Sequence, residues 1–344
     1  MITNIINMAE SIFRIKNAVK EIKGRQLGLS EPIRIQSVQA IKSGETHYNY
    51  LLIINNRKFL LRLTSVRKDD RGKNSWGAAR INMEFNGIKS IEKLGIAPKV
   101  YYKDTSCRAL SKPFVISDYV PGKPVTRMTE KDLKLLAFLL AELHNIHHVT
   151  GLRSEPVKDY NKEYIKKRVD KITDTGFKYV NRHFKADLME AYQRIKHIRL
   201  KTQKMSVIHG DISKDNLLRT GNSLKLIDWE SVRLSEPQFE IATALERLNL
   251  NGKKRKLFLL EYLKNSKKAN LNELEKYEKI RCFDRLLWSI SEFVKLKEGI
   301  TEKEKAQQKS PLKYVRNAHL EFLRCKALGL FPEESVLIIQ QKSK

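Results

Sequence analysis

VIHGDISKDNLL, residues 207–218, carries a histidine, a glycine, two aspartates, a lysine and an asparagine between two apolar ends. A simple connection between two elements needs only turn-forming residues. The apolar pairs Val207-Ile208 and Leu217-Leu218 predict short β segments on either side of a chemically active loop.

The stretch LKLIDWE, residues 224–230, completes the pattern. Asp211 is followed by Asn216 five residues later and by Asp228 seventeen residues later. Asn and Asp supply the oxygen ligands that Mg²⁺ prefers, and substrate phosphates can supply others. The remaining carboxylate, Asp211, is then free to orient a hydroxyl and accept its proton. One base carboxylate with Asn and Asp on a metal ion is the set that phosphoryl transfer from ATP requires.

Length and composition describe a folded protein of about two domains, at ~100–200 residues per domain. The 344 residues are 41 % hydrophobic and 31 % charged, which allows a sizeable core. No stretch approaches the ~18 consecutive apolar residues of a membrane helix, and the first residues lack the pattern of a secretory signal. We therefore expect a cytoplasmic protein without a membrane segment. Three scattered cysteines, Cys107, Cys282 and Cys325, argue against a disulfide framework or a zinc site.

The order of elements predicts an α+β fold. Residues 3–23 have the apolar spacing of an amphipathic helix that packs on the first domain. Two strands flanking Asn55-Asn56 form a hairpin, a helix runs from about residue 79 to Gly95, and residues 113–120 form another strand. Helices then predominate, the first of them beginning with a capping box from Thr129. We expect an N-terminal helix in residues 1–30, a small mainly β lobe with one helix in 31–119, and a larger mainly α lobe in 120–344.

HGDISKDN together with LIDWE resembles the aminoglycoside phosphotransferase/choline kinase superfamily over roughly residues 33–325. This resemblance implies a two-lobed protein-kinase-like fold that uses ATP and Mg²⁺. It implies that Asp211 is the catalytic base, that His209 braces the loop, and that Asn216 and Asp228 hold Mg²⁺. Glu230 matches an acidic residue of the family and is assigned to the acceptor site. In SEPQFEIA, Glu240 stands where the family usually has Asp.

The resemblance places the nucleotide on the N-terminal lobe. In KFLLRLT the alternation of a strand puts Arg62 on the same face as Lys58 and Leu60. Arg62 should bind the α- and β-phosphates and pair with Glu84, with Lys58 as the alternative. ISDYV, residues 116–120, resembles the hinge whose backbone binds adenine. The remaining predicted ATP-binding residues are Ser43, Gly44 and Thr46 in the turn of IKSGETHYNYLL, and Ser117 and Tyr119 in the hinge.

Two departures separate the chain from regulated protein kinases. Gly210 stands where those kinases carry an Arg that reads a phosphorylated activation loop, and the stretch from Asp228 to Glu240 is too short for such a loop. Both favour a small-molecule acceptor over a protein.

The helix RCFDRLLWSISEFV, residues 281–294, is the predicted acceptor element. Trp288 lies on the face opposite the apolar core residues, with Asp284 and Glu292 one turn before and after it. An aromatic ring between two carboxylates suits a cation, such as an amino-alcohol or an aminoglycoside amine. LLWSISEFV also looks like the Trp-bearing helix of choline kinases. The alternative is a half-buried surface Trp between solvated acids.

The net charge of +28 supports a second hypothesis. Residues 160–185 interleave aromatic side chains with basic residues, including Lys166, Lys167 and Arg168. Stacking together with phosphate pairing is how single-stranded RNA is held, so a kinase acting on RNA or another anionic macromolecule is the alternative. A non-catalytic nucleotide-binding module would lack a motif residue, and none is missing. We predict an ATP- and Mg²⁺-dependent small-molecule phosphotransferase, whose acceptor and oligomeric state the sequence does not specify.

Overall fold

A computed structural model describes residues 10–41, 47–64, 76–201, 203–266, 270–300 and 310–339. The chain divides into two compact units. The first unit comprises Met1–Arg153, Ser206–Leu234 and Asn251–Lys267, and the second comprises Ser154–Met205, Ser235–Leu250 and Lys268–Lys344. Within the described residues, no helix combines the length and the apolar character needed to cross a membrane.

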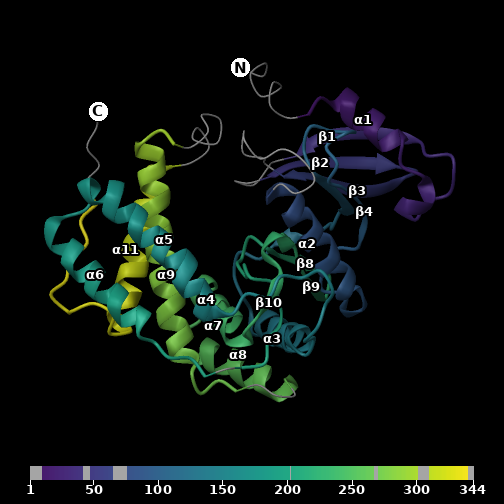
Figure 1. The fold of residues 1–344 in the computed structure, drawn as a ribbon. Helices are drawn as coiled ribbons and strands as arrows, with labels where there is room; N and C mark the ends of the chain where they lie inside the picture. Colours follow the sequence, from purple (N-terminus) through teal and green to yellow (C-terminus); the bar gives the residue numbers. More distant parts are fainter. Residues whose placement is uncertain are drawn as a thin grey trace. The chain divides into compact units, whose positions relative to one another are not determined.

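The first unit begins with a five-stranded antiparallel sheet, whose strand order is β1-β2-β3-β5-β4 (Figure 1). Its strands are β1 (Ile35–Ile41), β2 (His47–Ile54), β3 (Arg57–Thr64), β4 (Val100–Asp104) and β5 (Phe114–Asp118). The predicted hairpin of β2 and β3 is confirmed, with Ile54 paired to Arg57. Asn55 and Asn56 both have positive φ, 46° and 61°, which is the turn geometry that matches the twist of a hairpin.

Helices lie on the two faces of this sheet (Figure 1). Helix α1 (Ile12–Lys20) buries Ile15 and Val19 in a core cluster with Phe59 and Leu61 of β3. Arg62 points to the opposite face, where it meets helix α2 (Trp76–Ser90). The predicted N-terminal helix thus packs on the sheet; its residues 3–9 lie outside the described part.

Short 3₁₀ turns adjoin these helices. They are η1 (Gly24–Leu27) and η2 (Glu92–Leu94), and Gly95 ends η2 with a φ of 60°. Helix α2 approaches its neighbour very closely at Gly87, where an added Cβ would lie 2.8 Å from Cγ1 of Val232. Only glycine permits this distance between the helix backbone and Val232.

The rest of the first unit surrounds the polar loop. It contains β6 (Lys123–Pro124), α3 (Glu130–His144), β7 (Ser206–Ile208), β8 (Leu217–Thr220), β9 (Ser223–Leu226), η6 (Trp229–Ser231) and α8 (Gly252–Asn265). A further strand, β10 (Arg233–Ser235), pairs with β7. Strands β6, β8 and β9 form a three-stranded sheet. Helix α3 packs on α8, and the buried ring of His144 is hydrogen-bonded through Nδ1 to the Tyr262 hydroxyl at 2.8 Å.

In the part of the second unit that the structure describes, all the regular elements are helical apart from the end of β10 and one isolated bridge. They are α4 (Val157–Tyr160), η3 (Asn161–Ile165), α5 (Lys166–Lys171), η4 (Ile172–Gly176), η5 (Phe177–Tyr179), α6 (Arg182–Lys196), α7 (Pro237–Arg247), α9 (Leu274–Lys297) and α11 (Pro311–Ala327). Helix α9 is the central element and packs on α7 and α11. The thiols of Cys282 and Cys325 are buried between α9 and α11, with their Sγ atoms 3.1 Å apart.

The predicted capping box at the start of α3 is confirmed. The Asp132 carboxylate accepts a hydrogen bond from the Thr129 backbone N–H at 2.9 Å, and the Thr129 hydroxyl accepts one from the Asp132 N–H at 3.2 Å. Asp132 also binds Arg219 of β8, with a shortest N–O distance of 2.6 Å. Partial burial would raise the pKa of Asp132, but the bonds from Arg219 and Thr129 outweigh it and lower this pKa to about 2.

We expect Asp132→Ala to lower the free energy of unfolding at pH 7 by ~1–2 kcal/mol, because it removes a cap and an ion pair at once. The exposed Glu130 in the same turn is the control, and Glu130→Ala should change little. Since the pKa of Asp132 is lower in the folded state, its contribution should fade as the pH falls from 3.8 toward about 2. Urea unfolding across this pH range measures both effects; equal losses in the two variants would contradict the assignment.

Candidate active site

The polar loop between β7 and β8 is held by a buried histidine. His209 is fully buried, and its ring packs edge-on against Trp229 with the ring centres 4.6 Å apart. Its Nε2 lies 3.0 Å from the Ile227 carbonyl oxygen, and its Nδ1 accepts from the Asp211 N–H at 3.2 Å. These two contacts require the neutral tautomer with the proton on Nε2. His209 therefore connects the loop to the residue that precedes Asp228.

Asn216 fixes the other end of the same loop. Its Nδ2 donates to the backbone oxygen of Asp211 at 2.9 Å and to Oδ2 of the Asp211 carboxylate at 3.0 Å. The backbone carbonyl of Asn216 accepts from the Ile227 N–H at 3.0 Å, which continues the β8–β9 pairing. Asp211, Asn216 and the chain entering Asp228 are thus joined by direct hydrogen bonds. Because Nδ2 is used in this way, the Asn216 Oδ1 is the atom left for a ligand.

Asp228 lies at a sharp reversal of the chain. Its φ of 66° is in the left-handed region, which a residue with a side chain rarely adopts. Its Oδ1 accepts a hydrogen bond from Nη1 of Arg62 at 2.8 Å. A strained residue of this kind is typical of functional sites.

Arg62 lies between two carboxylates, of which the sequence predicted only Glu84. The same Nη1 is 3.1 Å from Oε1 of Glu84 on α2, so the predicted Arg62–Glu84 pair is present. Burial raises the pKa of Glu84, and Arg62 opposes that rise. Burial alone would lower the pKa of Arg62, but Glu84, Asp228 and Glu230 together raise it, so this guanidinium stays charged. The alternative, Lys58, is exposed.

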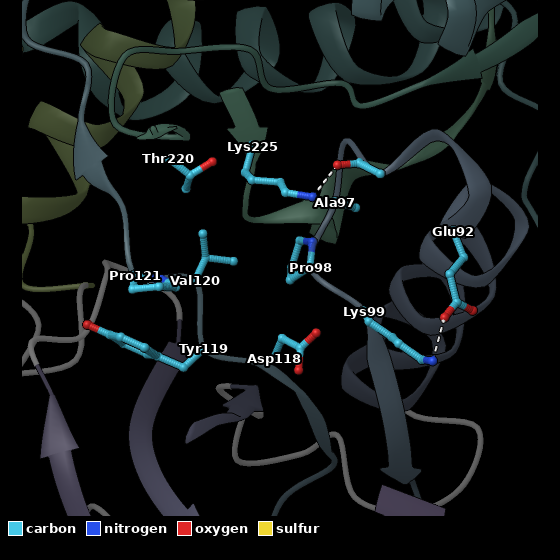
Figure 2. Close-up of a pocket in the computed structure, with 11 residues that line it drawn as sticks. Glu92, Ala97, Pro98, Lys99, Asp118, Tyr119, Val120, Pro121, Thr220 and Lys225 are labelled. Atoms are coloured by element: carbon cyan, nitrogen blue, oxygen red, sulfur yellow. Dashed lines mark hydrogen bonds and ion pairs between the residues drawn. The ribbon is translucent and has the colours of Figure 1, made fainter. Parts of the chain in front are cut away.

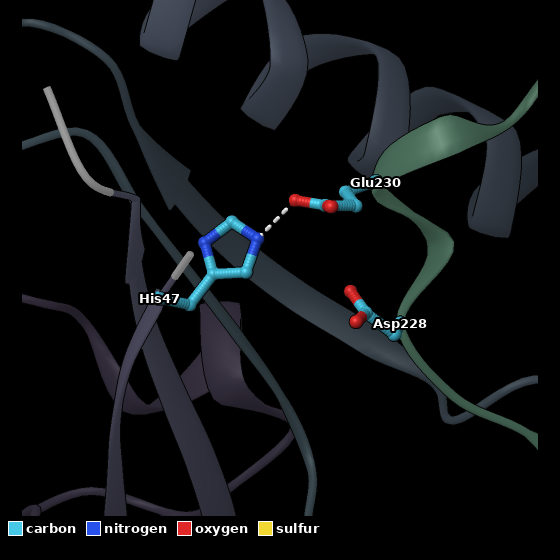
Figure 3. Close-up of side chains that lie close together, drawn as sticks. All are labelled: His47, Asp228 and Glu230. Atoms are coloured by element: carbon cyan, nitrogen blue, oxygen red, sulfur yellow. Dashed lines mark hydrogen bonds and ion pairs between the residues drawn. The ribbon is translucent and has the colours of Figure 1, made fainter. Parts of the chain in front are cut away.

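Glu230 has partners that the sequence did not predict. Its Oε1 is 2.9 Å from Nη2 of Arg80 on α2, and its Oε2 is hydrogen-bonded to Nε2 of His47 on β2 (Figure 3). Burial would raise the pKa of Glu230, but the bond from His47 and the charges of Arg80 and Arg62 lower it to about 2. Glu230 is therefore ionised at neutral pH. Arg80 precedes Glu84 by one helical turn, which was the only sequence signal for its position.

Two sets of side chains offer atoms that could hold a metal ion. Ligand atoms of His47, Asp228 and Glu230 lie within 4.8 Å of one another, but both oxygens of Glu230 are already bonded, one to Arg80 and the other to His47. The second set is the predicted pair of Asn216 and Asp228, whose amide oxygen and carboxylate are hard oxygen donors of the kind that Mg²⁺ prefers. The donor chemistry of Asn216 and Asp228 therefore fits the predicted magnesium site.

The predicted nucleotide-binding residues fall into three groups. Arg62 and Glu84 lie together in the site. Ser43, Gly44 and Thr46 lie outside the described residues. Ser117 is buried at the end of β5, and Tyr119 follows it in the hinge, where its N–H is 3.3 Å from the Lys58 carbonyl oxygen.

The hinge also borders a pocket of about 480 Å³ (Figure 2). Its lining comes from residues 95–99 without Ile96, residues 118–121, and three single residues, Glu92, Thr220 and Lys225. Tyr119 is the one predicted site residue that lines it. Two of its lysines are already bonded, Lys99 to Glu92 at 3.3 Å and Lys225 to the Gly95 carbonyl. None of Arg62, Asp228 and Glu230 is among the residues that line this pocket.

The predicted acceptor residues lie on α9 of the second unit. The guanidinium of Arg285 lies over the Trp288 ring, 4.4 Å from the ring centre, and Tyr314 contacts the ring edge-on. Asp284 and Glu292 are buried and paired: Asp284 with Arg168 and with Arg281, and Glu292 with Lys295. The protein's own cations thus occupy the positions that an amine was expected to take.

Together, a sheet-rich N-terminal part, a helical C-terminal part and the loop carrying Asp211, Asn216 and Asp228 define a phosphotransferase of protein-kinase-like fold. Residues 37–277 match the model of the phosphotransferase enzyme family, known as APH. This match covers more than half of the chain, so the chain belongs to that family. The predicted family, fold and enzyme class are confirmed.

Individual relatives are more distant. The chain is 25 % identical to the protein LicA homolog of Mycoplasma capricolum over 146 residues, which are 42 % of this chain and 56 % of that relative. The structure of choline kinase LicA from Streptococcus pneumoniae is similar with a TM-score of 0.58 and 14 % identity, over 91 % of this chain and 99 % of that one. The structure of spectinomycin phosphotransferase in complex with ADP and spectinomycin is similar with a TM-score of 0.59 and 15 % identity, over 90 % of this chain and 100 % of that one.

Gly210 offers a direct test of the loop geometry. Its φ is +84°, and a Cβ at this position would lie 2.5 Å from the Ser231 carbonyl oxygen and would also meet Arg233. Gly221 has a φ of +58° with nothing within 4 Å, so it is a matched control. Both substitutions to Ala cost about 1–2 kcal/mol for the left-handed backbone, and Gly210→Ala should lose a further ~1–3 kcal/mol through the clash. Denaturant unfolding measures the difference, and equal losses would count against the close packing of loop and turn.

Proposed function

We propose that this protein is a Mg²⁺-dependent kinase that transfers the γ-phosphate of ATP to a hydroxyl group of a small molecule. The observation that carries this proposal is the hydrogen-bonded group of Asp211, Asn216 and the chain at Asp228, next to a buried Arg62. Phosphoryl transfer needs positioned charges more than covalent chemistry from the protein.

Asp211 is the proposed base. Asn216 donates to Oδ2 of its carboxylate at 3.0 Å, so the side chain keeps a fixed direction. Asp211 would orient this hydroxyl and accept its proton as the oxygen attacks the γ-phosphorus. His209, through its bonds to Asp211 and Ile227, positions the loop and does not itself touch substrate in this scheme.

Asn216 and Asp228 would hold Mg²⁺. When bound, the ion would neutralise charge on the β- and γ-phosphates. Arg62, kept charged by Glu84, would bind the α- and β-phosphates, and the hinge backbone at Ser117 and Tyr119 would bind the base. The turn carrying Ser43, Gly44 and Thr46 would cover the phosphates. The solved complex of spectinomycin phosphotransferase with ADP supports the use of an adenine nucleotide.

An amino-alcohol or an aminoglycoside-like compound is the proposed acceptor class. Choline kinase LicA and spectinomycin phosphotransferase share the fold, and the first is named for an amino-alcohol. Trp288 keeps its proposed place in acceptor binding with Asp284 and Glu292, its neighbours on α9. However, an amine reaching the Trp288 ring has to displace Arg285, which lies over it at 4.4 Å.

The function is tested by an ATP-consumption screen against choline, ethanolamine, thiamine, aminoglycosides, sugars and RNA, run with ATP and again with GTP. With the best acceptor, Asp211→Asn should cut turnover by ~10²–10⁴-fold, because a positioned base is lost. Its affinity for Mg·ATP in calorimetry should hardly change. Asp215, an exposed carboxylate of the same loop, is the control, and Asp215→Asn should keep full turnover. Wild-type turnover in Asp211→Asn would refute the mechanism.

A second experiment separates an amine acceptor from RNA. If an amine binds at Trp288, Trp288→Ala should raise its KM by ~2–30-fold, the loss of a cation–π contact of ~0.5–2 kcal/mol, with the KM for ATP unchanged. If RNA is the substrate, Lys166→Glu and Lys167→Glu should weaken binding and reduce its salt dependence instead. Steady-state kinetics over a salt series measures both. Strong salt dependence with an indifferent Trp288 would exclude the amine assignment.

A further inference from the structure

Glu230 was assigned to the acceptor site, yet its surroundings belong to the nucleotide side. Both of its carboxylate oxygens are already bonded, Oε1 to Arg80 on α2 and Oε2 to His47 on β2. Its side chain is 15 % exposed, and that of His47 is 5 % exposed. We propose that Glu230 is a positioning residue that ties β2 and α2 to the turn carrying Asp228, and that it acts on Mg·nucleotide binding rather than on the acceptor. This inference rests on the proposed function.

Two sets of ion pairs join helix α2 to that turn, and α2 contributes a carboxylate to one and a guanidinium to the other. Glu84 of α2 binds Arg62, which binds Asp228. One helical turn earlier, Arg80 binds Glu230 directly at 2.9 Å. Any shift of α2 relative to the turn would therefore lengthen both sets of ion pairs. Together they keep Arg62 and Asp228 in fixed positions relative to each other.

His47 extends the same connection to the phosphate side. It is the first residue of β2, directly after residues 42–46, which contain the predicted phosphate-binding turn. Figure 3 shows its ring reaching across to Glu230, with Asp228 on the same side. The bond between His47 and Glu230 thus holds the first residue of β2 beside the chain segment that carries the proposed metal ligand Asp228.

Charge gives the connection a specific consequence for Mg²⁺. Arg62 is shared among Glu84, Asp228 and Glu230, all of which stabilise its charged form. Removing the charge of Glu230 leaves Arg62 to interact more strongly with Asp228. Arg62 would then compete better against a cation for that carboxylate, so the variant should need more Mg²⁺ to bind the nucleotide.

The test uses Glu230→Gln, Arg80→Gln, the double variant and the control Lys89→Gln, which alters an exposed ion pair on the same helix. Calorimetry with a non-hydrolysable ATP analogue, at limiting and at saturating Mg²⁺ and without acceptor, reports nucleotide binding alone. We expect each single variant to bind ~10–100-fold more weakly at limiting Mg²⁺, as loss of residues that support metal ligands does elsewhere. The difference in nucleotide affinity between each variant and the wild-type protein should become smaller at saturating Mg²⁺.

Two further results are expected. The double variant should bind no more weakly than the weaker single variant, because the two side chains act through each other. The KM for the acceptor should change less than ~2-fold, since binding that is not made to the acceptor leaves its KM alone. Should Glu230→Gln fail to fold in a circular-dichroism melt, Glu230→Asp, which keeps the charge but shortens the reach, replaces it.

The outcomes separate this inference from the proposed function. Unchanged Mg·nucleotide affinity with a raised acceptor KM would return Glu230 to the acceptor site and overturn the inference while the kinase assignment stands. Additive losses in the double variant would also overturn it. Failure of the wild-type protein to bind Mg·nucleotide at all would instead refute the proposed function on which it rests.

Discussion

The buried guanidinium of Arg62 is the interaction on which the site depends. It comes from the middle of the sheet, and it binds a helix carboxylate, Glu84, and a loop carboxylate, Asp228, through the same nitrogen. A buried cation is costly unless it is paired, and removing one partner of such a group costs more than the pair gains. The sheet, α2 and the turn after β9 are therefore positioned by one charge, so the geometry around Asp228 exists before any ligand arrives.

Around this charge the chain uses two kinds of restraint. Hydrogen bonds from the uncharged side chains of His209 and Asn216 fix the loop of Asp211, and they involve neighbours within twenty residues in sequence. Ion pairs from Arg62 and Arg80 connect elements that are far apart in sequence. The first kind sets the direction of the proposed base, Asp211, while the second sets the distance between the proposed nucleotide-binding elements and the proposed metal ligands.

Sequence reasoning predicted the features that are encoded locally. Residue type alone predicts the Asn55-Asn56 turn and, with a spacing of three residues, the Thr129 capping box. The alternation of side chains along a strand predicts the face of Arg62. Sequence reasoning could not predict that Arg80 and His47 bind Glu230, because the partners are separated by more than a hundred residues and the chain has 67 Lys and Arg side chains to choose from. The surroundings of Trp288 show the same limit. Arg285, over its ring, is only three residues away in sequence, but Arg168, which pairs with the neighbouring Asp284, comes from another helix and could not be predicted from the sequence.

The left-handed backbone at Asp228 has a consequence for how the protein tolerates mutation. By reversing the chain there, it sends the next side chain, Trp229, into the core, where the indole is fully buried and donates to the Leu226 carbonyl at 2.7 Å. A core residue thus stands between two residues of the site, with no stretch of chain to absorb a change in its packing. Substitutions at Trp229 should therefore disturb the fold and the geometry of the proposed site together, and we expect this position to tolerate less change than core positions of equal burial that lie away from the site.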